Sequence, residues 1–173
     1  MYDNWLANAT VVGATILTVV AAVLVHYEGL IYTAKAVVAY QGKHRVRVLF
    51  AISFTILLHV VEMWLFGLVM WALLQWPACG AIAGADDSPF FDLIYLSAIS
   101  YTTVGFGDVA PVGPIRFLVA TEAITGFVLI AWSASFTYLE MERFWSSKGS
   151  AAFSCRLREA TERLLTPFPK KGS

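Results

Sequence analysis

Three long apolar stretches set the pattern of this chain, and short polar segments separate them. They run from Leu6 to Val25, from Leu49 to Trp76 and from Ile115 to Tyr138. Each is long enough to cross about 30 Å of hydrocarbon as a helix, which rises about 1.5 Å per residue. A fourth stretch, Phe90 to Tyr101, is too short to cross and is predicted to enter the membrane from one side. We therefore expect an all-α membrane protein with three transmembrane helices and one re-entrant helix.

Composition and charge agree with this interpretation and predict an orientation. The 173 residues are 58% hydrophobic and 14% charged, with a mean hydropathy of +0.68, which is too apolar for an ordinary soluble domain. Eleven of the twelve Lys and Arg residues lie between the first two spans or after the third. Because basic residues gather on the cytoplasmic side, we expect the N-terminus outside and the C-terminus in the cytoplasm.

The segment after the short stretch carries the most informative motif, Thr102-Thr103-Val104-Gly105-Phe106-Gly107-Asp108. Its two glycines can adopt positive φ without a Cβ penalty, which lets successive carbonyls face one way instead of alternating as in a strand. The alternative is a surface loop that contains two glycines. The heptapeptide resembles the selectivity filter of the potassium-channel family, and it lies where a re-entrant pore loop of that family would lie.

This resemblance implies a set of functional residues. Potassium ions, with no organic cofactor, would bind the backbone carbonyls of four consecutive residues, Thr103, Val104, Gly105 and Phe106. The Thr103 hydroxyl would add the innermost ligands, and Thr102, Gly107 and Asp108 would support the filter. One chain carries one copy of the motif and four copies surround an ion, so the resemblance also implies a homotetramer.

On this basis we expect four parts in the chain. They are a peripheral transmembrane helix in residues 1–32, a basic linker at the cytoplasmic interface in 33–48, a pore domain in 49–140 and a cytoplasmic amphipathic tail in 141–173. Within the pore domain, the expected elements are an outer helix at 49–76, a pore helix at 90–101, the filter at 102–108 and an inner helix at 115–140.

The two junctions outside the pore domain are predicted from local polarity. The first helix should reach its end, and could bend, at His26-Tyr27-Glu28-Gly29. The basic linker is either a helix that lies on the inner surface against anionic lipids or a plain connector. After the inner helix, Ser146 begins a predicted break, and an amphipathic helix is expected from Ala152 to Leu165.

Ionisable residues inside membrane spans are costly and are therefore functional candidates. His59 and Glu62 are three residues apart on one face of the outer helix. They could act as a pH-sensing pair, belong to a His/Glu metal site, or form an inert packed pair. His26 with Glu28 is a second pH-sensing candidate, and its alternative is a polar pair that reaches the inner interface.

Two positions on the inner helix are further candidates. Helical rise puts Glu122 about 10 Å below the outer end of its span, at the depth of the filter. We hypothesise that Glu122 bonds to Ser100, Tyr101 or Thr102 behind the filter. Gly126, four residues later, is either a hinge, as in two-helix potassium pores, or a site of close helix packing.

The chain departs from the family pattern around the filter. Phe106 stands where tyrosine is commoner, Tyr95 and Leu96 replace a frequent pair of tryptophans, and Ile99 replaces a glutamate found in some bacterial channels. Because hydrogen-bonding groups are lost, we expect a filter that changes shape readily unless Glu122 compensates. Tyr95 is the remaining candidate for filter support on the pore helix.

The resemblance implies a potassium-selective channel of a prokaryotic inner membrane, similar to small bacterial channels with one extra N-terminal helix. The alternatives are a poorly selective monovalent cation channel and the membrane subunit or accessory protein of a potassium transporter. An enzyme is not expected, because no nucleophile, base and orienting group stand at recognisable spacing. Membrane lipids, and no nucleic acid, are the other expected partners. Cys79 is either an inert thiol or a cross-link between subunits, since Cys155 is predicted on the other side of the membrane.

Overall fold

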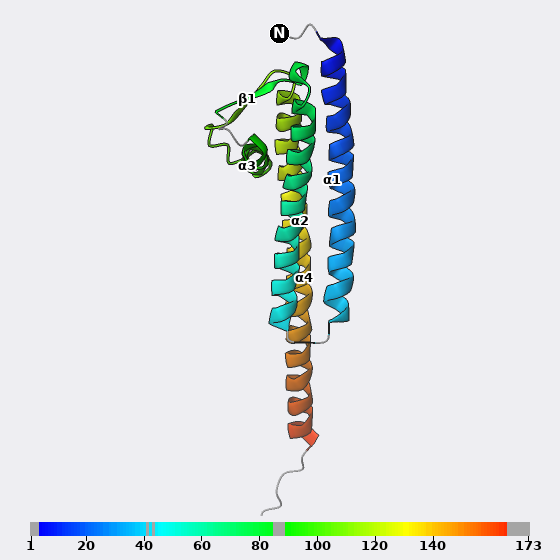
Figure 1. The fold of residues 1–173 in the computed structure, drawn as a ribbon. Coiled ribbons are helices and arrows are strands. Elements are labelled where there is room, and N and C mark those ends of the chain that lie inside the picture. The colour runs from blue at the N-terminus through cyan, green and yellow to red at the C-terminus, as the bar shows by residue number, and fades with distance from the viewer. Residues whose placement is uncertain (1–3, 41, 43, 85–88, 166–173) are drawn as a thin grey trace, which may run out of the picture.

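Three long helices lie side by side and form the body of the molecule (Figure 1). The computed structural model describes the chain except residues 1–3, 41, 43, 85–88 and 166–173. The long helices are α1 (Trp5–Ala39), α2 (His44–Leu74) and α4 (Arg116–Leu165). Each contains a segment long and apolar enough to cross a membrane, with mean hydropathies of 2.2, 2.1 and 1.7. This agrees with the expected all-α membrane architecture.

Helix α1 is longer than the sequence indicated and does not end near Gly29. A Cβ at Gly29 would lie 2.6 Å from Cδ2 of Leu58, so this glycine allows α2 to approach closely rather than bending the chain. The Thr33 hydroxyl donates to the Gly29 carbonyl over 2.7 Å within the continuing helix. One face of α1 is buried along its whole length, through Ala7, Val11, Thr15, Thr18, Ala22, His26, Leu30, Thr33 and Val37.

The expected basic linker at 33–48 is therefore not a separate surface helix. Its first part extends α1 to Ala39, and α2 begins at His44. The Arg47 side chain joins the two ends, because its Nε donates to the Tyr40 carbonyl over 2.6 Å. This bond satisfies a carbonyl that follows the last turn of α1, where no intrahelical donor is available.

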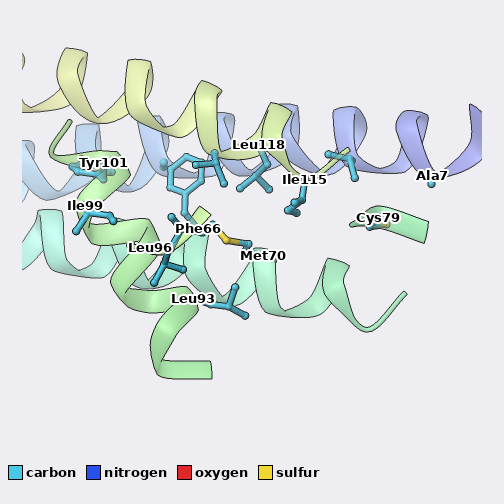
Figure 2. Close-up of a cluster of buried hydrophobic side chains, with 14 of the residues drawn as sticks. Ala7, Phe66, Met70, Cys79, Leu93, Leu96, Ile99, Tyr101, Ile115 and Leu118 are labelled. Atoms are coloured by element: carbon cyan, nitrogen blue, oxygen red, sulfur yellow. The ribbon is translucent and has the colours of Figure 1, made fainter. Parts of the chain in front are cut away.

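The short helix α3 (Pro89–Tyr101) lies to one side of the long helices, near the end at which α1 begins (Figure 1). Its inner face packs against α2 and α4. Figure 2 shows the buried cluster there, in which Phe66 and Met70 of α2 lie near Leu93 and Leu96 of α3 and Leu118 of α4. Burial of large apolar side chains on three helices holds α3 at a fixed depth.

A small two-stranded sheet frames the segment that contains α3. Strand β1 (Ala81–Ala83) pairs antiparallel with β2 (Ala110–Val112), with Ala81 opposite Val112. A 3-10 turn, η1 (Pro77–Cys79), precedes β1. These strands are not predictable from the sequence, because three residues are too few to show an alternating pattern.

Helix α4 runs without interruption to Leu165, so the inner helix does not end at 140 and the expected break at Ser146 is absent. Serine and glycine lower helix stability by less than about 1 kcal/mol each, and no proline is present to stop the helix. The far half of α4 extends beyond the other two long helices (Figure 1). Residues 166–173 of the predicted tail lie outside the described part.

Candidate ion-conduction site

Helix α3 leads directly into the 102–108 segment and is itself firmly packed against α2. Ser97, buried in the middle of α3, donates from its hydroxyl to the Met63 carbonyl of α2 over 2.7 Å. Gly67 of α2 lets the two helices touch, since a Cβ there would lie 2.5 Å from Cδ1 of Ile94 and 3.3 Å from its Cα. The start of the segment is thus fixed by packing and a hydrogen bond.

The backbone turns sharply where α3 ends. The Thr103 amide donates to the Ser100 carbonyl over 2.9 Å, and the Gly105 amide donates to the Ile99 carbonyl over 3.1 Å. These bonds fold the first half of the segment back against the last turn of α3. Thr103 is the only non-glycine residue with positive φ in the described part of the chain.

Positive φ recurs at every second residue of the segment. The φ angles are 58° at Thr103, 54° at Gly105 and 80° at Gly107. A strand in which all φ angles are negative alternates the direction of its carbonyls, and alternation of the sign of φ counteracts this. This pattern of φ angles favours carbonyls that face one side, which is the arrangement that the resemblance implies. Val104 and Phe106, which alternate with these residues, are 54% and 71% exposed within the single chain.

Asp108, at the end of the segment, is tied back to α3. The Tyr95 hydroxyl donates to Oδ2 of Asp108 over 2.8 Å. Tyr95 was a predicted filter support and Asp108 a predicted brace, and the structure brings the two side chains together. One hydrogen bond is therefore formed at the position where the family pattern has a pair of tryptophans.

Glu122 reaches α3 from α4, but its partner differs from the three that we expected. Its side chain is fully buried, and its Oε1 is hydrogen bonded to the Ser97 hydroxyl. Ser97 lies about one helical turn before Ser100 and Tyr101, so Glu122 braces the body of the pore helix and not its last residues. Its Oε2 has no hydrogen-bond partner within the described residues.

Gly126 lies directly against the last residue of α3. A Cβ at Gly126 would lie 2.2 Å from the Tyr101 carbonyl oxygen and 2.7 Å from Cγ of the same residue. Of the two interpretations that the sequence left open, this contact supports close packing, and the hinge stays a prediction. The glycine lets α4 pass behind the point where the filter segment begins.

A second polar cluster joins three helices behind Tyr101. His26 of α1 is fully buried, and its Nδ1 lies 2.8 Å from Oε1 of Glu62. His59 Nδ1 lies 3.1 Å from Oε2 of Glu62 and 2.9 Å from the Tyr101 hydroxyl, which also donates to Glu62. The expected pairing of His59 with Glu62 is present, and α3 takes part in it.

The expected pairing of His26 with Glu28 is wrong. His26 faces the helix interface while Glu28 is exposed, because residues two apart on a helix point in different directions. The sequence contained a signal for this. His26 continues the small and polar stripe of Thr15, Thr18 and Ala22 at intervals of three and four residues, which is typical of a helix face packed against another helix.

Cys79, the last residue of η1, is completely buried, and its carbonyl accepts a hydrogen bond from the Ile115 amide over 2.9 Å. Burial raises the pKa of the Cys79 thiol. The sulfur is not available at the surface of the folded chain, so the expectation that Cys79 could cross-link subunits is not supported. The inert-thiol interpretation fits this geometry.

Comparison with known proteins agrees with this geometry. The family model described as "Ion channel" matches residues 54–143, which is just over half of the chain and takes in most of α2, all of α3, the 102–108 segment and the first half of α4. The chain therefore belongs to this ion-channel family. Its apolar helices and its family make it an integral membrane protein.

Individual relatives are similar over parts of the chain. The chain is 34% identical over 67 residues to Protein LctB of Geobacillus stearothermophilus, covering 39% of this chain and 50% of the relative. It is 34% identical over 86 residues to the inward rectifier potassium channel Kirbac3.1 of Paramagnetospirillum magnetotacticum, covering 49% of this chain and 28% of that protein. The chain thus spans half or less of the length of these relatives. No solved structure matches it.

Proposed function

We propose that four copies of this chain form a potassium-selective channel, in which K⁺ loses its hydration shell and passes between backbone carbonyls of Thr103, Val104, Gly105 and Phe106. The observation that carries this proposal is the positive φ at every second residue of a segment whose sequence resembles the filter. Carbonyl oxygens in four such strands replace the water ligands of the ion, and repulsion between ions in adjacent sites assists exit.

The exposure of the filter segment supports the tetramer. All seven residues from 102 to 108 are exposed in the single chain, and they include two large apolar side chains. A re-entrant segment at membrane depth needs protein or a water-filled cavity around it. Four-fold assembly supplies both, because each segment then has a neighbouring subunit on one side and the pore on the other.

The orientation and location follow from the same proposal. With the N-terminus outside and the basic end of α4 in the cytoplasm, the filter lies near the outer face of a prokaryotic inner membrane. The acidic Asp108 then lies toward the outer mouth of the pore. A carboxylate there raises the local cation concentration within about 8 Å at physiological salt.

The test is ion flux through purified protein in liposomes. We expect a K⁺ gradient to drive flux that Ba²⁺ blocks, and reversal potentials under K⁺/Na⁺ gradients that follow the K⁺ equilibrium potential. A reversal potential that ignores the K⁺ gradient would indicate the poorly selective alternative. Absence of any passive flux in a tetrameric preparation would favour a transporter subunit or accessory protein.

A glycine substitution provides the matched comparison. Gly105→Ala adds a Cβ that meets no atom of its own chain within 4 Å, but φ of 54° is unfavourable for alanine. The variant should fold and lose selective flux. Gly13→Ala adds the same methyl group to α1, also in open space, and should conduct like the unaltered protein.

A further inference from the structure

The polar cluster at the junction of α1, α2 and α3 has a feature that conduction does not require. One imidazole of α1 converges with one imidazole and one carboxylate of α2, and their ligand atoms all lie within 4.8 Å of one another. We propose that His26, His59 and Glu62 bind a first-row transition-metal dication such as Zn²⁺. This site is separate from the filter and goes beyond the proposed conduction of potassium.

The distances are close to those that a metal site needs. In a tetrahedral Zn²⁺ site with bonds of about 2.0–2.1 Å, neighbouring ligand atoms are about 3.3 Å apart. In this structure Nδ1 of His26 and Nδ1 of His59 lie 2.8 Å and 3.1 Å from the two Glu62 oxygens. Only small side-chain movements would be needed to place an ion between these atoms. The Tyr101 hydroxyl lies 2.9 Å from Nδ1 of His59 and could serve as the fourth ligand.

The histidine from α1 is also oriented as a metal ligand should be. Its Nδ1 faces the cluster, while its Nε2 lies 3.2 Å from the Ser133 hydroxyl of α4. Histidine ligands in metal sites almost always use the second ring nitrogen in such a hydrogen bond, which fixes the ring and the tautomer. Ser133 is 3% exposed, so this orienting contact is shielded from water.

The charge of the cluster favours a cation. Glu62 is fully buried, and within the described residues its charged or polar partners are His26, His59 and Tyr101, with no lysine or arginine among them. A buried carboxylate is costly unless a positive charge or strong hydrogen bonds compensate it. With both imidazoles neutral the cluster carries one negative charge, and a dication would supply the compensation.

The types of ligand atom distinguish this ion from the K⁺ that we propose the channel conducts. Imidazole nitrogen with carboxylate oxygen suits Zn²⁺, Cu²⁺ and Ni²⁺, whereas K⁺, Mg²⁺ and Ca²⁺ prefer oxygen ligands alone. A bound metal would join α1 and α2 to Tyr101, the last residue of the pore helix before the filter segment. Binding should therefore stabilise the folded protein against heat, because the unfolded chain has no preformed site.

Metal binding to the purified, untagged protein tests this inference without any measurement of conduction. We expect isothermal titration with Zn²⁺ to give one ion per chain, and Co²⁺ to produce the intense visible absorption of a tetrahedral nitrogen and oxygen site. His59→Gln, at the partly exposed edge of the cluster, and Glu62→Gln should each weaken binding more than tenfold. Ser133→Ala keeps every ligand and should weaken it about tenfold.

Two control variants remove the same types of side chain from positions outside the cluster. His44→Gln removes the remaining histidine of the chain, and Glu28→Gln removes an exposed carboxylate from the same helix as His26. Both should bind metal like the unaltered protein. The inference is overturned if the unaltered protein binds no ion at one per chain in micromolar Zn²⁺, or if the control variants lose binding as much as His59→Gln does. Because His59→Gln and Ser133→Ala leave His26 and Glu62 in place, the test stands even if a more severe variant fails to fold.

Discussion

The hydroxyl of Tyr95 donates a hydrogen bond to Oδ2 of Asp108 over 2.8 Å, which ties the pore helix to the C-terminal end of the filter segment. The two residues are separated by the whole of the segment that we propose to bind K⁺. The filter segment is therefore held at one end by the end of α3, and near its other end by this bond and by the pairing of β1 with β2.

Tyr95→Phe should make the filter less stable, because it removes the hydroxyl and keeps the ring. When K⁺ is lowered on both sides of the liposome membrane, we expect K⁺ flux through this variant to decline several-fold more steeply than flux through the unaltered protein. The reason is that bound K⁺ and the Tyr95–Asp108 hydrogen bond both oppose collapse of the segment. Tyr32→Phe removes a hydroxyl from an exposed tyrosine of α1 and serves as the control. Equal K⁺ dependence in the two variants would show that the bond does not hold the filter.

Ser97 and Glu122 form a buried contact whose strength can be measured separately. A serine hydroxyl has one hydrogen, and Ser97 is hydrogen bonded both to the Met63 carbonyl and to Glu122. Ser97→Ala leaves these groups without that partner and should lower the free energy of unfolding by about 1–3 kcal/mol. Thermal unfolding of the purified protein measures this, and Ser135→Ala, an exposed serine of α4, should have little effect.

The same contact predicts opposite results for two substitutions of Glu122. Glu122→Gln keeps the shape of the side chain and a group that can bond to Ser97, so it should conduct selectively. Glu122→Leu removes the polar group and should reduce both thermal stability and the preference for K⁺ over Na⁺. If Glu122→Leu conducts K⁺ with unchanged selectivity, Glu122 does not support the filter.

Gly126→Ala should be strongly destabilising. The added Cβ would lie 2.2 Å from the Tyr101 carbonyl oxygen, and because that atom belongs to the backbone, the end of α3 must move. Overpacking of this kind typically costs about 1–3 kcal/mol. We expect a lower melting temperature and loss of selective flux, with Gly13→Ala as the control. A variant that keeps its melting temperature but opens less often would instead support the hinge.

The elements that the sequence predicted well are those encoded in local patterns. The three spans follow from continuous apolar stretches, and the 102–108 segment follows from two glycines next to a helix too short to cross. The structure contains these features because the length of an apolar helix and the φ angle of a glycine depend mainly on residues that are close in the sequence. The pairing of His59 with Glu62 belongs to the same group, since it depends only on helical spacing.

The elements that the sequence did not predict depend on contacts between distant residues. The approach of His26 to Glu62, 36 positions away, depends on how α1 packs on α2. The choice of Ser97 as the partner of Glu122 depends on the height of α3 relative to α4, which differs by one turn from our expectation. The continuation of α1 beyond Gly29 depends on a contact with Leu58 that no local pattern reveals.

Cys79 should resist both oxidation and alkylation in the folded protein. In a Cys155→Ser background it is the remaining cysteine, and its side chain is fully buried. Burial raises the pKa of its thiol, so at a given pH a smaller fraction is thiolate than in a free cysteine. At about pH 8.5, where an exposed cysteine is half ionised, maleimide should label Cys79 slowly before denaturation and completely afterwards.

An exposed thiol in the same region makes the comparison specific. Ala81 of β1 is exposed and two residues from Cys79, so Ala81→Cys, in a chain with both natural cysteines changed to serine, should be labelled rapidly at the same pH. The labelling rate of Cys79 should increase at a higher pH than the labelling rate of the thiol introduced at residue 81, because the buried thiol loses its proton at a higher pH. Rapid labelling of Cys79 at pH 8.5, or a disulfide-linked dimer of the Cys155→Ser protein on oxidation, would mean that the loop around the two-stranded sheet opens in the assembled channel.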